Sequence, residues 1–397
     1  MGAGSAIREV TSGWRTSVVL RIFATIAGVG ASVLIARLGG PEAKGVAAAY
    51  LASITTVFAV TNLGAGEQIV QITRDGNHSA RRLLIRFWFA YAVVAGLIAV
   101  VFLPVRPQLS VLTIGCLLYL IPIQASTVSI GFSGVMPDAI GALVQPLAVS
   151  AGVLLLSVDG GLTPQEAVGA LAVSYLAPFY VYWRGVPARG EARGVTLREL
   201  GRATLDGARW QVPNLALRVV QRADILAVFV LAGPAASGRY SVAVQLAELC
   251  FLVPRQIANH SYHRLTVADS LDTRRAVMTT MVAATATAVP IGLLGGFGIN
   301  LLYGEEFSAA TGDLYILLPG TVVGSVAFLM FWIFRGKGRL RMSTISSLSG
   351  AFTLLVGCAV LIPPFGTAGA AVSCSVAWGV FAVVAVTLHK RRVTVAA

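Results

Sequence analysis

Residues 17–38 read SVVLRIFATIAGVGASVLIARL, and they are followed by the turn GGPEAKG at 39–45 and by a second apolar run, VAAAYLASITTVFAVTNLGAG, at 46–66. Each run is close to the roughly 20 residues that a helix needs to cross the hydrocarbon core of a bilayer. Pro and Gly end one helix and permit a tight reversal before the next. The stretch therefore predicts two antiparallel membrane-spanning helices.

The same pattern continues along the whole chain. Hydrophobic residues make up 56% of the 397 residues and charged residues only 12%, with a mean hydropathy of +0.79, whereas soluble domains carry about 25% charged residues. A soluble protein of this length could not bury so much apolar surface. We therefore predict an all-α polytopic membrane protein with twelve transmembrane helices. The predicted spans are 17–38, 46–66, 83–103, 109–130, 140–158, 167–183, 212–231, 241–260, 277–299, 314–334, 345–362 and 368–388.

The basic residues predict the orientation of these spans. If the N-terminus is cytoplasmic, 23 of the 30 Lys and Arg residues fall in cytoplasmic segments, and only Arg37, Lys44, Arg106 and Arg239 fall in outer ones. An excess of Lys and Arg on one side marks the cytoplasmic face. Both termini are thus predicted to be cytoplasmic. Because this topology accounts for the net charge of +13, we expect no nucleic-acid partner.

A short motif occurs twice, at about half the chain length. The turn at 40–45 reads GPEAKG and the turn at 233–238 reads GPAASG, so both fit GPxxxG and lie 193 residues apart. Six predicted spans separate them, which gives the two halves the same orientation and predicts a parallel repeat. We expect six-helix lobes at 1–190 and 210–397, joined by an Arg-rich cytoplasmic linker at 191–209. The other loops are too short for a soluble domain.

The four cysteines all fall inside predicted spans and show no CxxC or Cys/His spacing. Such cysteines predict neither a disulfide framework nor a metal site. We expect them to pack as small buried apolar residues. They are Cys116, Cys250, Cys358 and Cys374.

Three arginines lie within predicted spans, namely Arg21, Arg218 and Arg222. Ionisable groups at membrane depth cost about 2.5 to 3.5 kcal/mol each and tend to face a cavity or a partner. Guanidinium groups bind phosphate oxygens in a bidentate manner, so these arginines are candidate ligands for an anionic substrate. Two alternatives stay open. In the first, Arg218 or Arg222 forms an ion pair with Asp224 or Glu248. In the second, the side chain of Arg21 only extends to the cytoplasmic interface.

Two carboxylates also lie at membrane depth, Asp224 in the seventh predicted span and Glu248 in the eighth. Desolvation there disfavours the charged form of a carboxyl group. Both are candidates for coupling transport to H⁺ or Na⁺, and no other cofactor is expected. A fixed salt bridge to an arginine is the alternative for each.

Four motifs, in order along the chain, resemble those of a known family. They are ARLGGPEAKG at 36–45, GPAASGRYSVAVQLAEL at 233–249, LYGEEF at 302–307 followed by LLPG at 317–320, and GTAGAA at 366–371. Together they resemble the polysaccharide-biosynthesis flippases of the multidrug/oligosaccharidyl-lipid/polysaccharide (MOP) exporter superfamily, which includes O-antigen flippases. One departure is Gly39, an extra glycine before the Gly-Pro pair, and the chain is also short for the superfamily.

This resemblance implies a MATE-like, V-shaped bundle of two lobes around a central cavity. It implies a transporter that flips a polyprenyl-diphosphate-linked oligosaccharide across a bacterial inner membrane by alternating access. Arg21, Arg218 and Arg222 would bind the diphosphate, and other polysaccharide-assembly proteins would be partners. Two other functions stay open: a cation-coupled multidrug exporter of the same superfamily, which would need carboxylates in its cavity, and a membrane enzyme of polysaccharide assembly, which would need larger outer loops.

Overall fold

The computed structural model describes residues 3–62, 79–102, 107–158, 160–188, 197–258 and 272–396, together with 66, 69, 70, 73 and 261. Throughout these residues the chain is helical or in turns, with no strand. The sequence therefore predicted the secondary-structure class correctly. The first residues of the linker predicted at 191–209 lie outside the described part of the chain.

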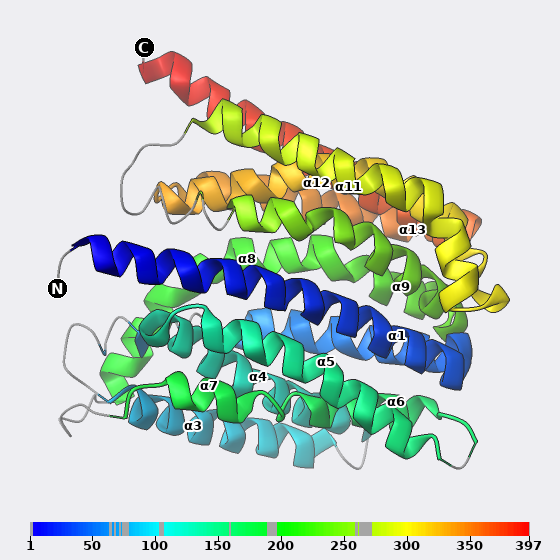
Figure 1. The fold of residues 1–397 in the computed structure, drawn as a ribbon, viewed down its shortest axis with the longest axis horizontal. Helices are drawn as coiled ribbons and strands as arrows, with labels where there is room; N and C mark the ends of the chain where they lie inside the picture. The colour runs from blue at the N-terminus through cyan, green and yellow to red at the C-terminus, as the bar shows by residue number, and fades with distance from the viewer. Residues whose placement is uncertain are drawn as a thin grey trace. The chain divides into compact units, whose positions relative to one another are not determined.

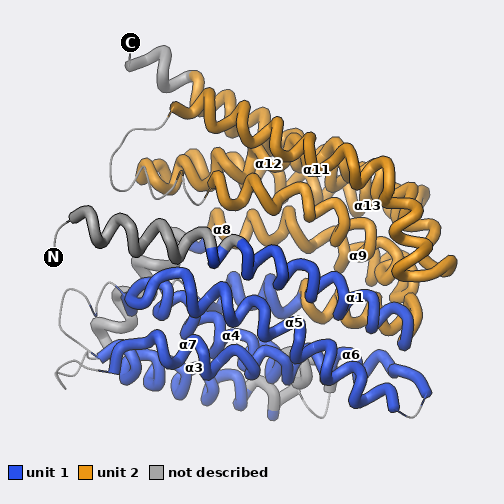
Figure 2. The backbone as a smooth tube through the Cα atoms, viewed as in Figure 1, with its two compact units in different colours: residues 1–38, 53–211 blue, residues 39–52, 212–397 orange. Residues whose placement is uncertain are grey.

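Contacts between Cα atoms divide the chain into two compact units, coloured separately in Figure 2. Unit 1 comprises Met1–Leu38 and Ser53–Gln211, and unit 2 comprises Gly39–Ala52 and Val212–Ala397. The short segment Gly39–Ala52 belongs to unit 2 although the residues on either side of it belong to unit 1. The two repeat lobes at 1–190 and 210–397 remain a prediction, because compact units reflect contacts and not internal repetition.

Unit 1 is organised around a central helix, α4 (Pro107–Ser133). The helices α3 (Ala80–Phe102), α5 (Met136–Leu156), α6 (Pro164–Ser174) and α7 (Phe179–Gly185) all pack against α4. Arg81, in the first turn of α3, donates to the carbonyl oxygens of Val186 at 2.8 Å and Trp183 at 3.2 Å. It thus provides a side-chain donor to carbonyl groups at the end of α7, one of which, that of Trp183, also accepts from the Val186 N–H.

Unit 2 is organised around α12 (Ala310–Gly336), which packs against α9 (Pro234–Glu248), α11 (Thr273–Leu302) and α13 (Leu340–Ala396) (Figure 1). In the most apolar 18-residue stretch of each helix, 72% of the residues are buried in α12 but only 11% in α11. Large apolar side chains such as Leu293 and Phe297 are exposed on one face of α11. In water such a face would be unstable, so it indicates contact with lipid.

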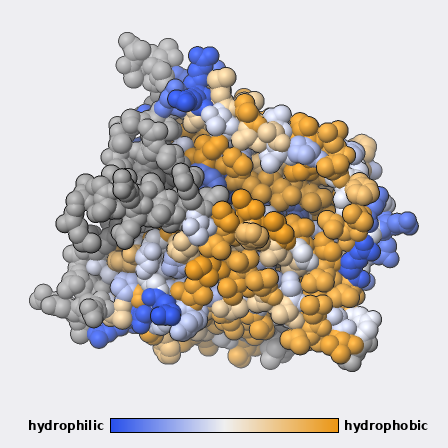
Figure 3. Space-filling model, viewed as in Figure 1, coloured by the Kyte–Doolittle hydropathy of each residue, from blue (hydrophilic) through white to orange (hydrophobic). Residues whose placement is uncertain are grey.

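Seven helices in the described part of the chain are long and apolar enough to cross a membrane. Two of them, Val19–Thr61 and Leu340–Lys390, have 43 and 51 residues and kink at Gly40 and Gly366. A 43-residue helix is about 65 Å long, which is twice the roughly 30 Å bilayer core. Each long helix therefore contains two predicted spans, one before the kink and one after it. Apolar side chains also cover much of the face in Figure 3. The count of twelve spans stays a prediction.

The sixth predicted span, 167–183, is not one helix. It is divided between α6 and α7, and the turn between them ends at Pro178. Proline lacks the N–H that a helix needs and collides with the preceding turn, which explains the break. In the eighth span α9 gives way at Glu248 to the 3₁₀ turn η1 (Leu249–Phe251), shortly before Pro254.

The two GPxxxG turns meet inside unit 2. Gly40 and Gly233 have φ of 69° and 91°, values that favour glycine, and they begin the two helical turns. A Cβ placed on Gly45 would lie 1.8 Å from the carbonyl oxygen of Pro234, and one placed on Gly238 would lie 1.9 Å from that of Pro41. The last glycine of each motif therefore packs against the backbone of the proline in the other motif, and neither glycine position has room for a side chain.

Candidate functional site

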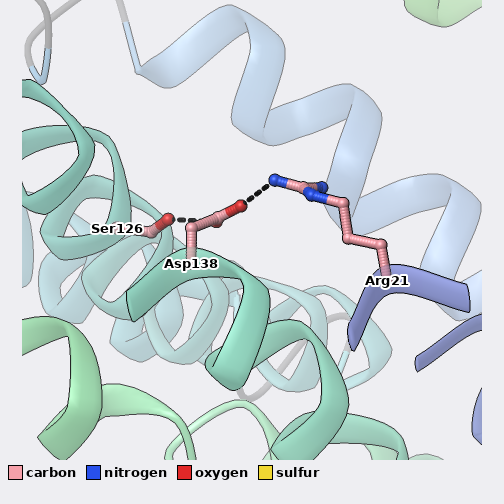
Figure 4. A network of polar contacts seen from close by, with 3 residues as sticks. All are labelled: Arg21, Ser126 and Asp138. Atoms are coloured by element: carbon pink, nitrogen blue, oxygen red, sulfur yellow. Dashed lines mark hydrogen bonds and ion pairs between the residues drawn. The ribbon is translucent and has the colours of Figure 1, made fainter. Parts of the chain in front are cut away.

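The first candidate arginine, Arg21, is paired within unit 1. Its side chain leaves α1 (Ala3–Thr61) and binds the Oδ2 of Asp138, in the first turn of α5 (Figure 4). The hydroxyl of Ser126, on α4, donates to the other oxygen of Asp138 at 2.6 Å. The Arg21 side chain is 37% exposed and the Asp138 side chain 19%. Arg21 is thus held by a carboxylate and still has an accessible surface.

Sequence reasoning missed Asp138. It lies two residues before the fifth predicted span, so that it was assigned to a loop. One signal was present: Asp138 follows Pro137 at the start of a helix, where the helix dipole favours a carboxylate. That signal could have marked Asp138 as an ordered acid near the membrane, but not Arg21 as its partner.

In unit 2, Arg222 forms an ion pair across two helices. It lies on α8 (Leu197–Ala232), and its Nη2 is 3.0 Å from the Oε2 of Glu248, the last residue of α9. The two side chains are 24% and 21% exposed. The sequence had kept this pairing as the alternative to an anion site. The ion pair is present, and both partners still have accessible surface that a ligand could reach.

Arg218 behaves differently from Arg222, although it lies one turn away on the same helix. It is exposed and donates to Gln221 on α8 at 3.4 Å, a long hydrogen bond. A contact of this length holds a guanidinium only weakly. Arg218 therefore has more conformational freedom than Arg222 or Arg21.

The second candidate carboxylate, Asp224, is almost completely buried, with an exposure of 1%. It accepts hydrogen bonds from the Tyr240 hydroxyl at 2.8 Å and from the backbone N–H of Ile225 at 2.9 Å. Tyr240 comes two residues after the second GPxxxG motif, so that its hydroxyl connects the start of α9 to Asp224 on α8. The two acids proposed for ion coupling therefore have different kinds of bonding partner. Glu248 contacts an arginine, whereas Asp224 is bound by neutral donors.

Removing the Tyr240 hydroxyl should weaken the fold. In Tyr240→Phe the buried Asp224 loses one of its side-chain donors and keeps the Ile225 N–H and the contact with the Cys374 thiol, and we expect a loss of about 1–3 kcal/mol in stability, the cost of removing a hydrogen bond from a buried polar group. Thermal melting of the purified protein in detergent measures the loss. Tyr315→Phe is the matched control, because Tyr315 is 49% exposed. Equal melting temperatures for the two variants would show that the hydroxyl contributes nothing.

Two charged residues that lie outside the predicted spans are buried in helices of unit 2. Lys44 is 8% exposed and acts electrostatically on Arg222. Asp313, in the first turn of α12, is 4% exposed and bonds to Thr367. The sequence placed Lys44 in the turn at 39–45 and left Asp313 one residue before the tenth predicted span, but helices include both positions. The four cysteines are buried, as predicted.

An apolar groove of about 280 Å³ lies between α9 and α11. Leu246 of α9 lines it together with Pro290, Leu294 and Gly298 of α11. None of the candidate charged residues lines this groove. It opens within the apolar surface of α11 and is separate from both ion pairs.

This arrangement of helices is similar to that of solved α-helical membrane transporters of the MOP superfamily. A structure described as the inward-facing conformation of a multidrug resistance MATE family transporter of the MOP superfamily matches with a TM-score of 0.74 and 14% identity. The match covers 95% of this chain and 98% of that one. At such low identity the match establishes the fold alone.

Two further structures extend the comparison. The lipid II flippase MurJ, in an inward closed conformation, has a TM-score of 0.70 and 11% identity, covering 95% of this chain and 87% of that one. A MOP superfamily transporter from Pyrococcus furiosus, reported with a binding pocket of reverse polarity that suggests a different function, has a TM-score of 0.59 and 15% identity, with 95% of each chain covered. No family model and no curated protein matches the sequence.

Proposed function

We propose that this protein is a transporter that flips a polyprenyl-diphosphate-linked oligosaccharide across a bacterial inner membrane by alternating access. The observation that carries the proposal is the presence, in each unit, of an arginine at membrane depth with accessible surface. These are Arg21 in unit 1 and Arg222 in unit 2. A guanidinium keeps its charge and its fork of donors at any physiological pH, so it suits a diphosphate.

The fold supports this proposal without deciding the substrate. One structure with the same fold is a lipid II flippase by name, and another is a multidrug transporter. The four motifs of the polysaccharide-flippase resemblance favour the first. Arg218, exposed and weakly held, would provide a further contact to the diphosphate as it moves. Asp224 and Glu248 would couple the movement to H⁺ or Na⁺.

The second candidate is a cation-coupled multidrug exporter of the same superfamily. The observation in its favour is the pair of acids, Asp224 and Glu248, in the spans that carry Arg222 and its partner. A drug cation would need an accessible carboxylate without a countercharge. Glu248 has Arg222 beside it, and Asp224 is buried with neutral donors. We therefore favour the anionic substrate, and we place a membrane enzyme of polysaccharide assembly third.

Reconstitution of the full chain into liposomes distinguishes these candidates. A fluorescent polyprenyl-diphosphate oligosaccharide is placed in the inner leaflet, and its arrival in the outer leaflet is read by quenching with a reagent that cannot cross the membrane. Uptake of ethidium is measured in parallel. We expect protein-dependent flipping of the lipid and no ethidium transport. Ethidium transport without lipid flipping would reject the proposal in favour of the exporter.

A further inference from the structure

The two ion pairs share a design. In each, a guanidinium that would have to bind substrate phosphate is occupied by a carboxylate of the protein, Asp138 for Arg21 and Glu248 for Arg222. The four side chains are 19–37% exposed, and in both pairs the arginine is the more exposed partner. A phosphate can thus approach the guanidinium, but one of its terminal nitrogens, Nη2, already donates to a carboxylate in each pair.

A guanidinium cannot hold both anions at low cost. Two negative charges about 4 Å apart repel each other by about 4 kcal/mol at the effective dielectric of a protein surface. The arginine cannot lose its own proton to adjust. When a phosphate binds, the carboxylate must therefore leave or be neutralised. Away from water, a carboxylate without a countercharge favours its neutral, protonated form.

We propose that Asp138 and Glu248 are internal ligands that the substrate phosphates displace, each exchange being accompanied by the uptake of one proton. This step rests on the proposed function and deepens it. In the exchange the arginine–carboxylate contact breaks and an arginine–phosphate contact forms. The carboxylate takes a proton from solvent, and no covalent bond of the substrate changes. The protein would bind the diphosphate together with protons.

The surroundings of each carboxylate allow the exchange. Asp138 retains the Ser126 hydroxyl as a hydrogen-bond partner after Arg21 leaves, and among the described residues Tyr182 is a titratable group that acts electrostatically on both members of this pair. Glu248 is faced by Arg222, Asp224 and Cys374, and Lys44 acts on Arg222. The positive charge of Lys44 favours an anion on Arg222. Asp224 is not exchangeable in this way, because it is buried and bound by neutral donors.

Binding measured against pH tests the exchange. The purified full chain in nanodiscs is titrated with geranylgeranyl diphosphate between pH 6 and 8.5, in buffers of different ionisation enthalpy, so that Kd and proton uptake are both obtained. Each linked proton changes Kd about tenfold per pH unit. Since the probe itself titrates, the quantity compared is the difference between variants. Asp138→Asn/Glu248→Gln keeps both shapes and removes both acids.

We expect the wild type to take up more protons than this double variant, by up to one for each acid, and its Kd to depend more steeply on pH. At pH 8 the double variant should bind about tenfold more tightly, because its arginines no longer need to exchange a charged partner. The single variants should each show about half of the difference in proton uptake, which keeps the test valid if the double variant does not fold. Glu305→Gln, an exposed acid outside both pairs, should match the wild type.

Two results would contradict these expectations in different ways. If the probe binds but wild type and double variant take up equal numbers of protons, the carboxylates only position the arginines and the exchange is rejected. If the probe binds to no form of the protein, the diphosphate substrate is rejected and the exchange with it. Tighter binding with unchanged proton uptake would also reject the exchange, because the carboxylates would then compete without being protonated.

Discussion

Arg222→Ala should reduce transport of the lipid-linked oligosaccharide by at least about a hundredfold, because a charge-assisted hydrogen bond contributes about 1.5–3 kcal/mol and the lost fork would make two of them, or about 3–6 kcal/mol together. Arg222→Lys keeps the charge but presents no fork, so we expect an intermediate loss. The measurement is the flipping rate in liposomes, supported by surface polysaccharide in cells. Normal polysaccharide with Arg222→Ala would reject the role of this residue.

The ion pair complicates the interpretation of that variant, since Arg222→Ala also leaves Glu248 without its partner. The double variant Arg222→Ala/Glu248→Ala resolves this, because it removes both charges together. If Arg222 binds phosphate, the double variant stays inactive although its stability recovers. If activity recovers as well, Arg222 served only to neutralise Glu248. Arg239→Ala is a matched control, because Arg239 makes only a 3.4 Å contact to a carbonyl of its own helix among the contacts described.

The second large effect should come from the glycine contact in unit 2. Gly45→Ala and Gly238→Ala would each place a Cβ within 2 Å of a backbone oxygen. Backbone cannot rotate away as a side chain can, so we expect each substitution to destabilise the protein by about 3 kcal/mol or more, at the upper end of overpacking effects. Thermal melting of the detergent-solubilised protein measures this loss.

Two controls sharpen the test. Gly28→Ala meets no atom within 4 Å and should be neutral or stabilising by up to about 1 kcal/mol, as expected in a helix. The double variant Gly45→Ala/Gly238→Ala should lose less than the sum of the single variants, because once the turns have separated both methyl groups fit. Strict additivity would show that the two glycines do not share one contact.

Much of the architecture could be predicted from the sequence because it depends on local patterns. Apolar runs of span length became helices, and the GPxxxG pattern marked helix starts that require glycine at Gly40 and Gly233. Pro178 was visible, but the sequence did not show that it would divide the sixth span, because a proline within a membrane helix often only bends it. Local patterns thus predicted most of the helices in the described part of the chain, while the count of twelve spans stays a prediction.

The partners in the candidate site could be predicted much less well. Arg222 and Glu248 are 26 residues apart on consecutive helices, and that pairing was foreseen as an alternative. Arg21 and Asp138 are 117 residues apart, and nothing local connects them. The burial of Lys44 was not predicted for the same reason, since it depends on how the two turns pack. A single sequence indicates which charges enter the membrane but not which helices become neighbours.

The different separations of the two ion pairs also bear on how the chain is made. At about 5–20 residues per second of synthesis, Glu248 follows Arg222 within a few seconds, so α8 and α9 can enter the bilayer as a neutralised hairpin. Asp138 follows Arg21 only after roughly 6–23 seconds. During that interval α1 carries a guanidinium without its acid, and the long side chain must extend to an aqueous surface of the bilayer. Of the two ion pairs, the one that involves α1 is therefore completed later in synthesis, and its arginine must be accommodated without its acid for longer.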